Sequence, residues 1–259
     1  MKIRLFCIFL LGFSIFSGEG ELIKKTVGYE EDGVKMEGYL VYDDVQKSSK
    51  PGVLVVHDWM GIGSFSKQKA EELAQLGYVA FAADIYGVKN WPKDAKEAGV
   101  ISNELKENRK LLRARVQAAL KVLQKEKEVQ PNKIAAIGYC FGGTTVLELA
   151  RSGADVVGVV SFHGGLSSPT PEDAKQIKGK VLVLHGADDP NVPAEEVAAF
   201  QKEMREAKVD WQMVSYGNAV HSFTNPEASK AGMKGMAYNK FADQRSWKAM
   251  KVFFKELFQ

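Results

Sequence analysis

The chain has 259 residues, of which 45% are hydrophobic and 26% charged, and its formal net charge is +3. This composition is typical of a soluble globular protein, and the length suffices for one large α/β domain or two small ones. The 35 basic and 32 acidic side chains are mixed along the chain, which argues against nucleic acid or an acidic surface as a partner.

The first twenty residues differ from the rest of the chain. Lys2 and Arg4 precede a short apolar run that continues to Phe16, and small residues follow it. This order is typical of a secretory signal peptide, and the run is too short to span a bilayer comfortably. We expect a signal peptide over 1–20, one domain over 21–259 and export to the periplasm or medium, with no membrane span left after cleavage. An uncleaved N-terminal anchor is the alternative.

Cysteine usage follows from this prediction. Of the two cysteines, Cys7 lies in the predicted signal, so the mature protein would keep only Cys140. An exported protein with one cysteine has no internal disulfide. A single thiol in an oxidising compartment is a liability unless it is buried or functional, so Cys140 is either an inert core residue or a catalytic group.

The predicted elements alternate between strand and helix after an initial hairpin. The segments Lys24–Glu30 and Lys35–Tyr42 flank a short turn and predict two antiparallel strands. Apolar runs predict further strands at 53–56, 78–83, 133–137, 156–161, 181–184 and 211–215. Helical periodicity predicts helices at 66–76, 102–125, 142–151, 194–207 and from about 239 to near the C-terminus. We therefore predict an α/β fold with a mostly parallel central sheet, helices on both faces and an N-terminal antiparallel hairpin.

The segment around Cys140 carries the strongest functional pattern. The predicted strand ends in Gly138-x-Cys140-x-Gly142, and a predicted helix follows at once. This pattern is typical of a nucleophile elbow, with cysteine in place of the more usual serine. The tight turn crowds the residues two before and two after the nucleophile, so both must be glycine. A helix N-terminus behind the turn also favours a thiolate.

A cysteine nucleophile needs a base, and the base needs an acid that fixes its tautomer. All four histidines follow predicted strands, on the side where α/β sheets bind ligands. In α/β-hydrolases the chain order is nucleophile, acid, histidine, which selects Asp189 and then His221 after Cys140. His185 precedes this acid on the same short loop and fits the base poorly. The remaining two, at 57 and 163, are interpreted as structural residues around the site.

The choice of acid leaves one alternative. Asp188 adjoins Asp189 on the same loop. The spacing Gly186-x-x-Asp189-x-x-Val192-Pro193 matches a recurrent acid loop of this fold, so Asp189 is preferred and Asp188 is interpreted as a loop residue.

The oxyanion hole and the substrate pocket are expected near these groups. An oxyanion hole needs two backbone N–H groups aimed at one point. Phe141, directly after the nucleophile, is expected to supply one, and Trp59 in the loop after 53–56 the other. The pocket walls are expected from apolar residues nearby: Trp59, Met60, Ile85, Tyr86, Trp91 and Phe223. A metal site competes for the same His and Asp residues, but their spacings match no compact zinc motif, so no metal or other cofactor is predicted.

Together these motifs resemble the dienelactone hydrolase family of α/β-hydrolases, from about residue 22 to the C-terminus. The resemblance rests on the segments 56–61, 83–87, 138–143, 185–193 and 221–226, of which Gly-Tyr-Cys-Phe-Gly-Gly and His-Ser-Phe are the most specific. It implies a triad of Cys140, Asp189 and His221 that hydrolyses an ester or lactone without a cofactor. It also implies that Asp58 is the auxiliary acid that helps to control the protonation of the cysteine.

Two positions depart from the family pattern. Family members that open dienelactones use arginines to hold the substrate carboxylate, and this chain has Val88 and Asn225 at those positions. We therefore predict a small-molecule ester or lactone substrate and a thioester acyl-enzyme, without assigning a dienelactone. A catalytically silent binding protein, a thioesterase or peptidase with the same triad, and a metal-dependent hydrolase are the alternatives. The sequence leaves the oligomeric state open.

Overall fold

The computed structural model describes residues 21–45, 48–230 and 232–259. The predicted signal peptide over 1–20 lies outside these residues and stays a prediction. Within the described ranges, no helix is both long enough and apolar enough to cross a membrane.

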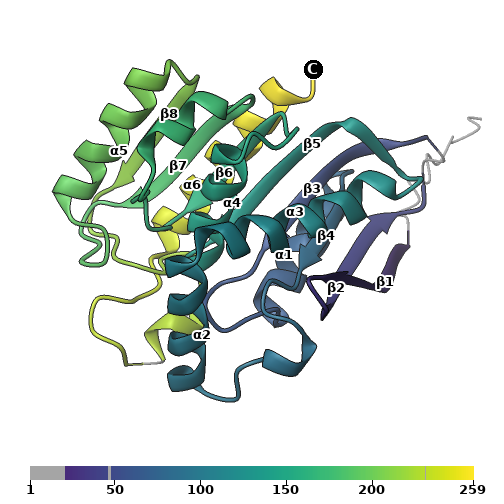
Figure 1. Ribbon diagram of the computed structural model, residues 1–259, viewed down its shortest axis with the longest axis horizontal. Helices are drawn as coiled ribbons and strands as arrows, with labels where there is room; N and C mark the ends of the chain where they lie inside the picture. Colours follow the sequence, from purple (N-terminus) through teal and green to yellow (C-terminus); the bar gives the residue numbers. More distant parts are fainter. Residues whose placement is uncertain (1–20, 46–47, 231) are drawn as a thin grey trace, which may run out of the picture.

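One eight-stranded sheet forms the centre of the molecule, in the order β1-β2-β4-β3-β5-β6-β7-β8 (Figure 1). Its strands are β1 (Leu22–Glu31), β2 (Val34–Asp43), β3 (Lys50–Val56), β4 (Val79–Ala83), β5 (Val129–Tyr139), β6 (Gly158–Phe162), β7 (Lys180–Gly186) and β8 (Trp211–Tyr216). The hairpin β1–β2 and the pair β2–β4 are antiparallel, and the six strands from β4 to β8 in the sheet order are parallel. The predicted α/β architecture is confirmed.

Helices cover both faces of this sheet, as the two separate hydrophobic cores show. The helices are α1 (Ser64–Gln75), α2 (Ala95–Glu107), α3 (Arg109–Lys125), α4 (Phe141–Arg151), α5 (Ala194–Ala207) and α6 (Lys240–Leu257). One core joins apolar residues of α3, α4 and α5 to alternate strand residues such as Leu54 and Val56. The other joins α1 and α6 to the intervening residues, such as Val53 and Val55. The strands are therefore buried on both faces, which explains their continuous apolar runs.

The predicted helix over 102–125 is wrong in its extent. The structure has two helices here, α2 and α3, which meet at Asn108. The backbone of Asn108 is not helical (φ −98°, ψ 73°), and its side-chain oxygen accepts a hydrogen bond from the N–H of Leu111 at 3.1 Å. Asparagine is a favoured N-cap, so it ends one helix and begins the next without interrupting the apolar stripe.

A buried network of charges links three helices on one face of the sheet. Arg151 is fully buried, and its guanidinium contacts Glu203 of α5 at 2.7 Å and Glu148 of α4 at 3.0 Å. Its third nitrogen donates to the carbonyl of Leu166 at 2.9 Å. Arg113 of α3 extends the network to the other oxygen of Glu148 at 2.8 Å. Every charge in the network has an opposite partner, which is the condition for burying charges.

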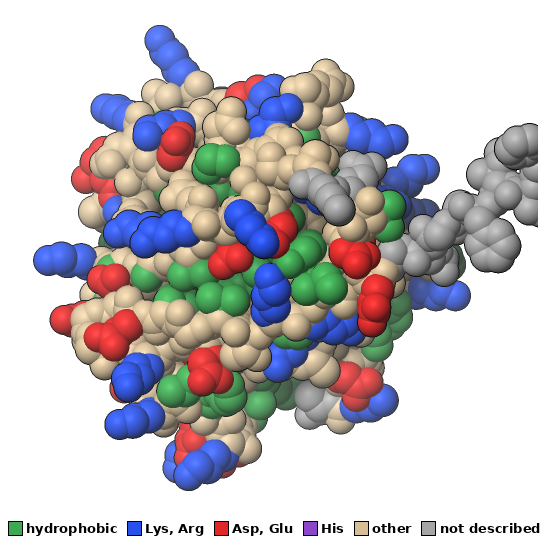
Figure 2. Space-filling model, turned by 90° about the vertical axis from the view of Figure 1, so that its right-hand side faces the viewer, with side chains coloured by type: hydrophobic (Ala, Val, Ile, Leu, Met, Phe, Trp, Pro, Cys, Tyr) green, Lys and Arg blue, Asp and Glu red, His purple; other side chains and the backbone are tan. Residues whose placement is uncertain are grey.

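The surface carries charges of both signs. Figure 2 shows Lys and Arg side chains interspersed with Asp and Glu over the face that it presents. No large field of a single sign forms on that face, which agrees with the near-balanced composition.

Candidate active site

Cys140 lies on a sharp turn between β5 and α4. Its backbone has φ 54° and ψ −113°, a conformation that L-residues other than glycine rarely adopt. The flanking glycines are required by close backbone contacts. A Cβ at Gly138 would lie 2.0 Å from the carbonyl oxygen of Gly142, and a Cβ at Gly142 would lie 2.3 Å from that of Val56. The elbow geometry predicted from the glycine spacing is therefore present, with the Cys140 side chain partly exposed.

These contacts predict that Gly142→Ala destabilises the fold. The new methyl group would collide with backbone atoms of β3, which cannot move without disturbing the sheet, so the loss should exceed about 2 kcal/mol. Gly28→Ala is the matched control, because a Cβ there meets nothing within 4 Å. Chemical denaturation of both variants measures the difference. Equal stability of the two variants would contradict the close approach of α4 to β3.

The structure brings Cys140, His221 and Asp189 together. The Nε2 atom of His221 lies 3.0 Å from the Sγ atom of Cys140, and its Nδ1 atom lies 2.8 Å from Oδ2 of Asp189. The other Asp189 oxygen accepts from the N–H of Asn191 at 2.8 Å. Asp188, the alternative acid, is exposed and makes no hydrogen bond to His221, and the side chain of His185 contacts neither sulfur nor acid within hydrogen-bond distance.

The protonation of His221 depends on these two neighbours. Burial disfavours its charged form, but the adjoining Cys140 sulfur and the Asp189 carboxylate outweigh burial and raise the pKa of His221 from 6.5 to about 10. An opposite charge in contact is the usual cause of such a shift.

Asp58 and Asn225 lie at the edge of the same site. Burial raises the pKa of Asp58, whereas the N–H of Met60 and the nearby His57, His221 and Asn225 oppose the shift. The Asn225 side-chain oxygen also accepts from the N–H of Glu227 at 3.0 Å. The position at which the family resemblance implied an arginine therefore holds a neutral amide close to the Asp58 carboxylate. Sequence patterns gave no signal for this contact, because it joins two loops far apart in the chain.

The two predicted oxyanion donors have free backbone N–H groups. Among the described residues, the N–H of Trp59 and that of Phe141 have no hydrogen-bond acceptor. Trp59 follows β3, and Phe141 opens α4 directly after Cys140. Parallel strands bring their carboxyl ends to one edge of the sheet, so both loops lie on the Cys140 side.

The two histidines interpreted as structural are buried and hydrogen-bonded. His163 accepts from the N–H of Cys140 at 3.1 Å through Nδ1, and its Nε2 lies 2.8 Å from Oγ1 of Thr224. Burial and the neighbouring His221 hold the pKa of His163 well below its usual range. This ring therefore links the elbow to the loop of His221 in a neutral form. The sequence did not indicate Thr224, which only the fold brings to His163.

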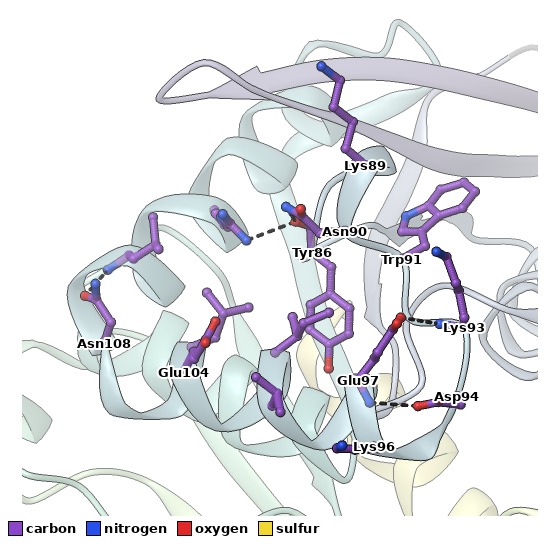
Figure 3. Close-up of a pocket in the computed structure, with 15 residues that line it drawn as sticks. Tyr86, Lys89, Asn90, Trp91, Lys93, Asp94, Lys96, Glu97, Glu104 and Asn108 are labelled. Atoms are coloured by element: carbon purple, nitrogen blue, oxygen red, sulfur yellow. Dashed lines mark hydrogen bonds between the residues drawn. The ribbon is translucent and has the colours of Figure 1, made fainter.

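The predicted pocket residues lie in different surroundings. Tyr86 and Trp91 line a groove of about 870 Å³ between their loop and helices α2 and α3 (Figure 3). Trp91 is 42% exposed, whereas Phe223 is fully buried and packs edge-on against His163. Phe223 thus differs from its predicted place in the pocket wall, because it packs against His163 and does not reach solvent. The described residues that line the groove do not include Cys140. Within the described ranges, no group of three His, Cys, Asp or Glu side chains could hold a metal ion.

Comparisons with known proteins show the family to which the chain belongs. A model of the dienelactone hydrolase family matches residues 36–258. A crystal structure of a dienelactone hydrolase-like promiscuous phosphotriesterase from metagenomic libraries is 42% identical, covers 93% of this chain and 100% of its own, and has a TM-score of 0.90. A structure named m3DLH has the same identity and coverage, with a TM-score of 0.89. Protein usf of Aquifex pyrophilus is 30% identical over 90% of this chain and 98% of its own length.

The parallel sheet, the elbow at the end of β5 and the groups gathered beside it define an α/β-hydrolase. Within this class, the chain belongs to the dienelactone hydrolase family and is a hydrolase of esters or lactones. The comparisons therefore favour an enzyme over a catalytically silent binding protein.

Proposed function

We propose that Cys140, His221 and Asp189 form a catalytic triad that hydrolyses esters or lactones through a thioester. The observation that carries the proposal is the continuous contact of sulfur, imidazole and carboxylate, at 3.0 Å and 2.8 Å. Asp189 holds Nδ1 of the ring, which leaves Nε2 directed at the sulfur. The sulfur lies on a strained turn, and the N–H groups of Trp59 and Phe141, which have no acceptor among the described residues, follow strands that end at the same edge of the sheet. Both features support acyl transfer.

Acylation uses the charged pair. The Cys140 sulfur, as a thiolate, forms a bond to the carbonyl carbon of the ester, and the carbonyl oxygen becomes an oxyanion. The N–H groups of Trp59 and Phe141 donate to this oxygen. The tetrahedral species then collapses: the carbon–oxygen bond to the alcohol breaks, and the leaving oxygen takes the proton from Nε2 of His221. The products are a free alcohol, a thioester on Cys140 and a neutral His221.

Deacylation uses the same ring as a base. In the thioester the sulfur carries no charge, so the main influence that raises the pKa of His221 is gone, and burial favours the neutral ring. Neutral His221 takes a proton from water while the water oxygen attacks the thioester carbonyl. The carbon–sulfur bond breaks, the acid leaves, and the thiolate–imidazolium pair is restored. One group thus serves as acid and then as base because the charge beside it changes.

The substrate class that we propose is an uncharged aryl or alkyl ester, or a small lactone. Val88 is apolar and Asn225 is a neutral amide, so neither supplies a cation for a substrate carboxylate. Trp59 and Met60, in the loop that follows β3, offer accessible apolar surface for a hydrophobic acyl or alcohol group.

A substrate panel tests this proposal. Purified protein is assayed with p-nitrophenyl esters of increasing acyl length, with alkyl esters and with γ- and δ-lactones, each with and without EDTA. We expect turnover of uncharged substrates, at a rate that EDTA leaves unchanged. Turnover should be weaker for analogues that carry a free carboxylate beside the ester. Loss of activity in EDTA would favour the metal-dependent hydrolase, and cleavage of peptides alone would favour a peptidase.

The titration of His221 provides a check on the two-state role of its ring. A pKa of about 10 means that the ring in the folded protein stays protonated as the pH rises through 6.5, the ordinary value of a histidine. The protonated ring therefore adds stability that is fully present below about pH 6.5, and this stability is lost as the pH rises toward 10. In Cys140→Ala the negative sulfur is absent, so the pKa should move to lower pH. Imidazole ¹³C chemical shifts of selectively labelled protein measure both values. An identical pKa in the two proteins would contradict the proposed charge coupling.

Phosphotriester hydrolysis is a second candidate activity. The observation that favours it is the 42% identity to a structure described as a promiscuous phosphotriesterase. A thiolate can form a bond to phosphorus and expel an aryloxide, which takes a proton from Nε2 of His221. Water must then hydrolyse the S-phosphorylated Cys140 that remains. Paraoxon turnover by the wild-type protein tests it. A single burst without further turnover would limit this activity to inactivation of Cys140.

A further inference from the structure

We propose that His57 and Tyr86 are positioning residues that together fix the backbone N–H of Trp59 in the oxyanion hole. The proposal rests on the function proposed above, since it assigns to two buried residues a task in that reaction. Both side chains are fully buried, and neither contacts Cys140 or His221 by a hydrogen bond. Each instead bonds the backbone on one side of the Trp59 amide.

His57 holds the peptide that precedes Trp59. Its Nε2 accepts from the N–H of Ile85 at 3.1 Å, so the ring proton lies on Nδ1. That Nδ1–H donates to the carbonyl oxygen of Asp58 at 2.6 Å, and the N–H of Gly61 donates to the same oxygen at 3.2 Å. In a trans peptide the N–H points opposite to the C=O. Fixing the Asp58 carbonyl therefore fixes the direction of the Trp59 N–H.

Tyr86 holds the peptide that follows. Its phenolic O–H donates to the carbonyl oxygen of Trp59 at 2.8 Å. Figure 3 shows the Tyr86 side chain extending from its loop into the space between that loop and α2. With His57 on one side and Tyr86 on the other, both peptide planes that flank Trp59 are fixed. The Trp59 N–H, which belongs to the first of these planes, has no acceptor among the described residues. An N–H donor that has a fixed direction and no hydrogen-bond acceptor is suited to stabilise an oxyanion.

The same two rings also connect the two oxyanion donors. His57 stacks on the ring of Phe141 with centroids 5.7 Å apart, and Tyr86 packs on Phe141 at 5.3 Å and on His57 at 4.7 Å. The relative placement of the loop after β3 and the start of α4 thus depends on this aromatic trio. Burial lowers the pKa of His57 and, with the nearby Cys140 and Asp58 charges, raises the pKa of Tyr86. Both hydrogen bonds therefore persist across neutral pH.

The test compares two reactions of the same sulfur. Acylation by p-nitrophenyl acetate forms an oxyanion and needs the hole, whereas alkylation by iodoacetamide displaces iodide at a saturated carbon and does not. In Tyr86→Phe, we expect the burst rate of acylation to fall about tenfold or more, toward the ~10²–10³ of a lost oxyanion donor. The alkylation rate should stay within about twofold of wild type, because the contact of Cys140 with His221 is unchanged.

Two substitutions of His57 separate its hydrogen bonds. The amide nitrogen of asparagine is as far from Cγ as Nδ1 is, so His57→Asn can still donate to the Asp58 carbonyl. His57→Gln places its amide at the Nε2 distance and keeps only the contact with Ile85. A positioning role predicts that acylation survives better in His57→Asn than in His57→Gln, with similar alkylation rates. For Tyr86→Phe, the matched control is Tyr139→Phe, which removes a buried hydroxyl that has no hydrogen-bond partner.

Several outcomes would overturn the proposal. Wild-type acylation in Tyr86→Phe, equal losses in the two His57 variants, or a parallel fall of acylation and alkylation would each reject it. The last result would mean that the substitutions merely loosen the whole site. A failure of the proposed function is distinguishable: it would appear as wild-type turnover in Cys140→Ala, whatever the Tyr86 and His57 variants do.

Discussion

Replacing Cys140 with alanine is expected to lower ester turnover by about 10⁴-fold or more, because the proposed covalent intermediate forms on its sulfur. Alanine keeps the Cβ atom and faces the same backbone strain at φ 54° as cysteine, so the elbow itself should persist. Steady-state hydrolysis of p-nitrophenyl butyrate by matched preparations measures the effect, and thermal unfolding checks that the variant is folded. Turnover within tenfold of wild type would mean that another residue is the nucleophile.

Replacing Arg151 with methionine should lower the free energy of unfolding by about 3–5 kcal/mol. The substitution leaves the Glu203 carboxylate buried without its partner and removes one of two cations from Glu148. Urea denaturation measures the loss. Lys230→Met is the control, since its ion pair with Glu227 is exposed on both sides (74% and 69%) and should contribute nothing measurable.

A double variant tests the cause of that loss. Adding Glu203→Leu to Arg151→Met removes the unpaired carboxylate, so part of the stability should return. If the double variant is less stable than Arg151→Met, the loss arises from packing of the arginine stem and not from a stranded charge. A loss below about 1 kcal/mol in Arg151→Met alone would contradict the burial of the network.

The fold was largely predictable because its physical signals are local. Strands buried on both faces appear as continuous apolar runs, and helices with one buried stripe repeat about every 3.6 residues. The boundary between α2 and α3 at Asn108 was not predicted, because the apolar stripe that contains Leu105 and Leu112 continues across it and both residues are buried. Only the cap, a polar side chain that bonds the next turn, marks the break.

The candidate site was predictable in part. Gly138, Cys140 and Gly142 carry their geometry in their spacing, and chain order places Asp189 and His221 after them. The tasks of His57 and Tyr86 depend on tertiary contacts to the backbone of a third loop, which no periodicity encodes. Phe223 was predicted in the pocket wall but lies in the core. Its apolar character fits both places equally well, and only its burial in the structure decides between them.

The residue that carries the acyl group during turnover tests the proposed mechanism most directly. Wild-type protein is mixed with p-nitrophenyl acetate, quenched in acid during the steady state and digested, and the peptides are examined by mass spectrometry. We expect one acetyl group on the peptide that contains Cys140, released by hydroxylamine as a thioester is. Acetylation of a different residue, or rapid turnover with Cys140 never acylated, would contradict that mechanism.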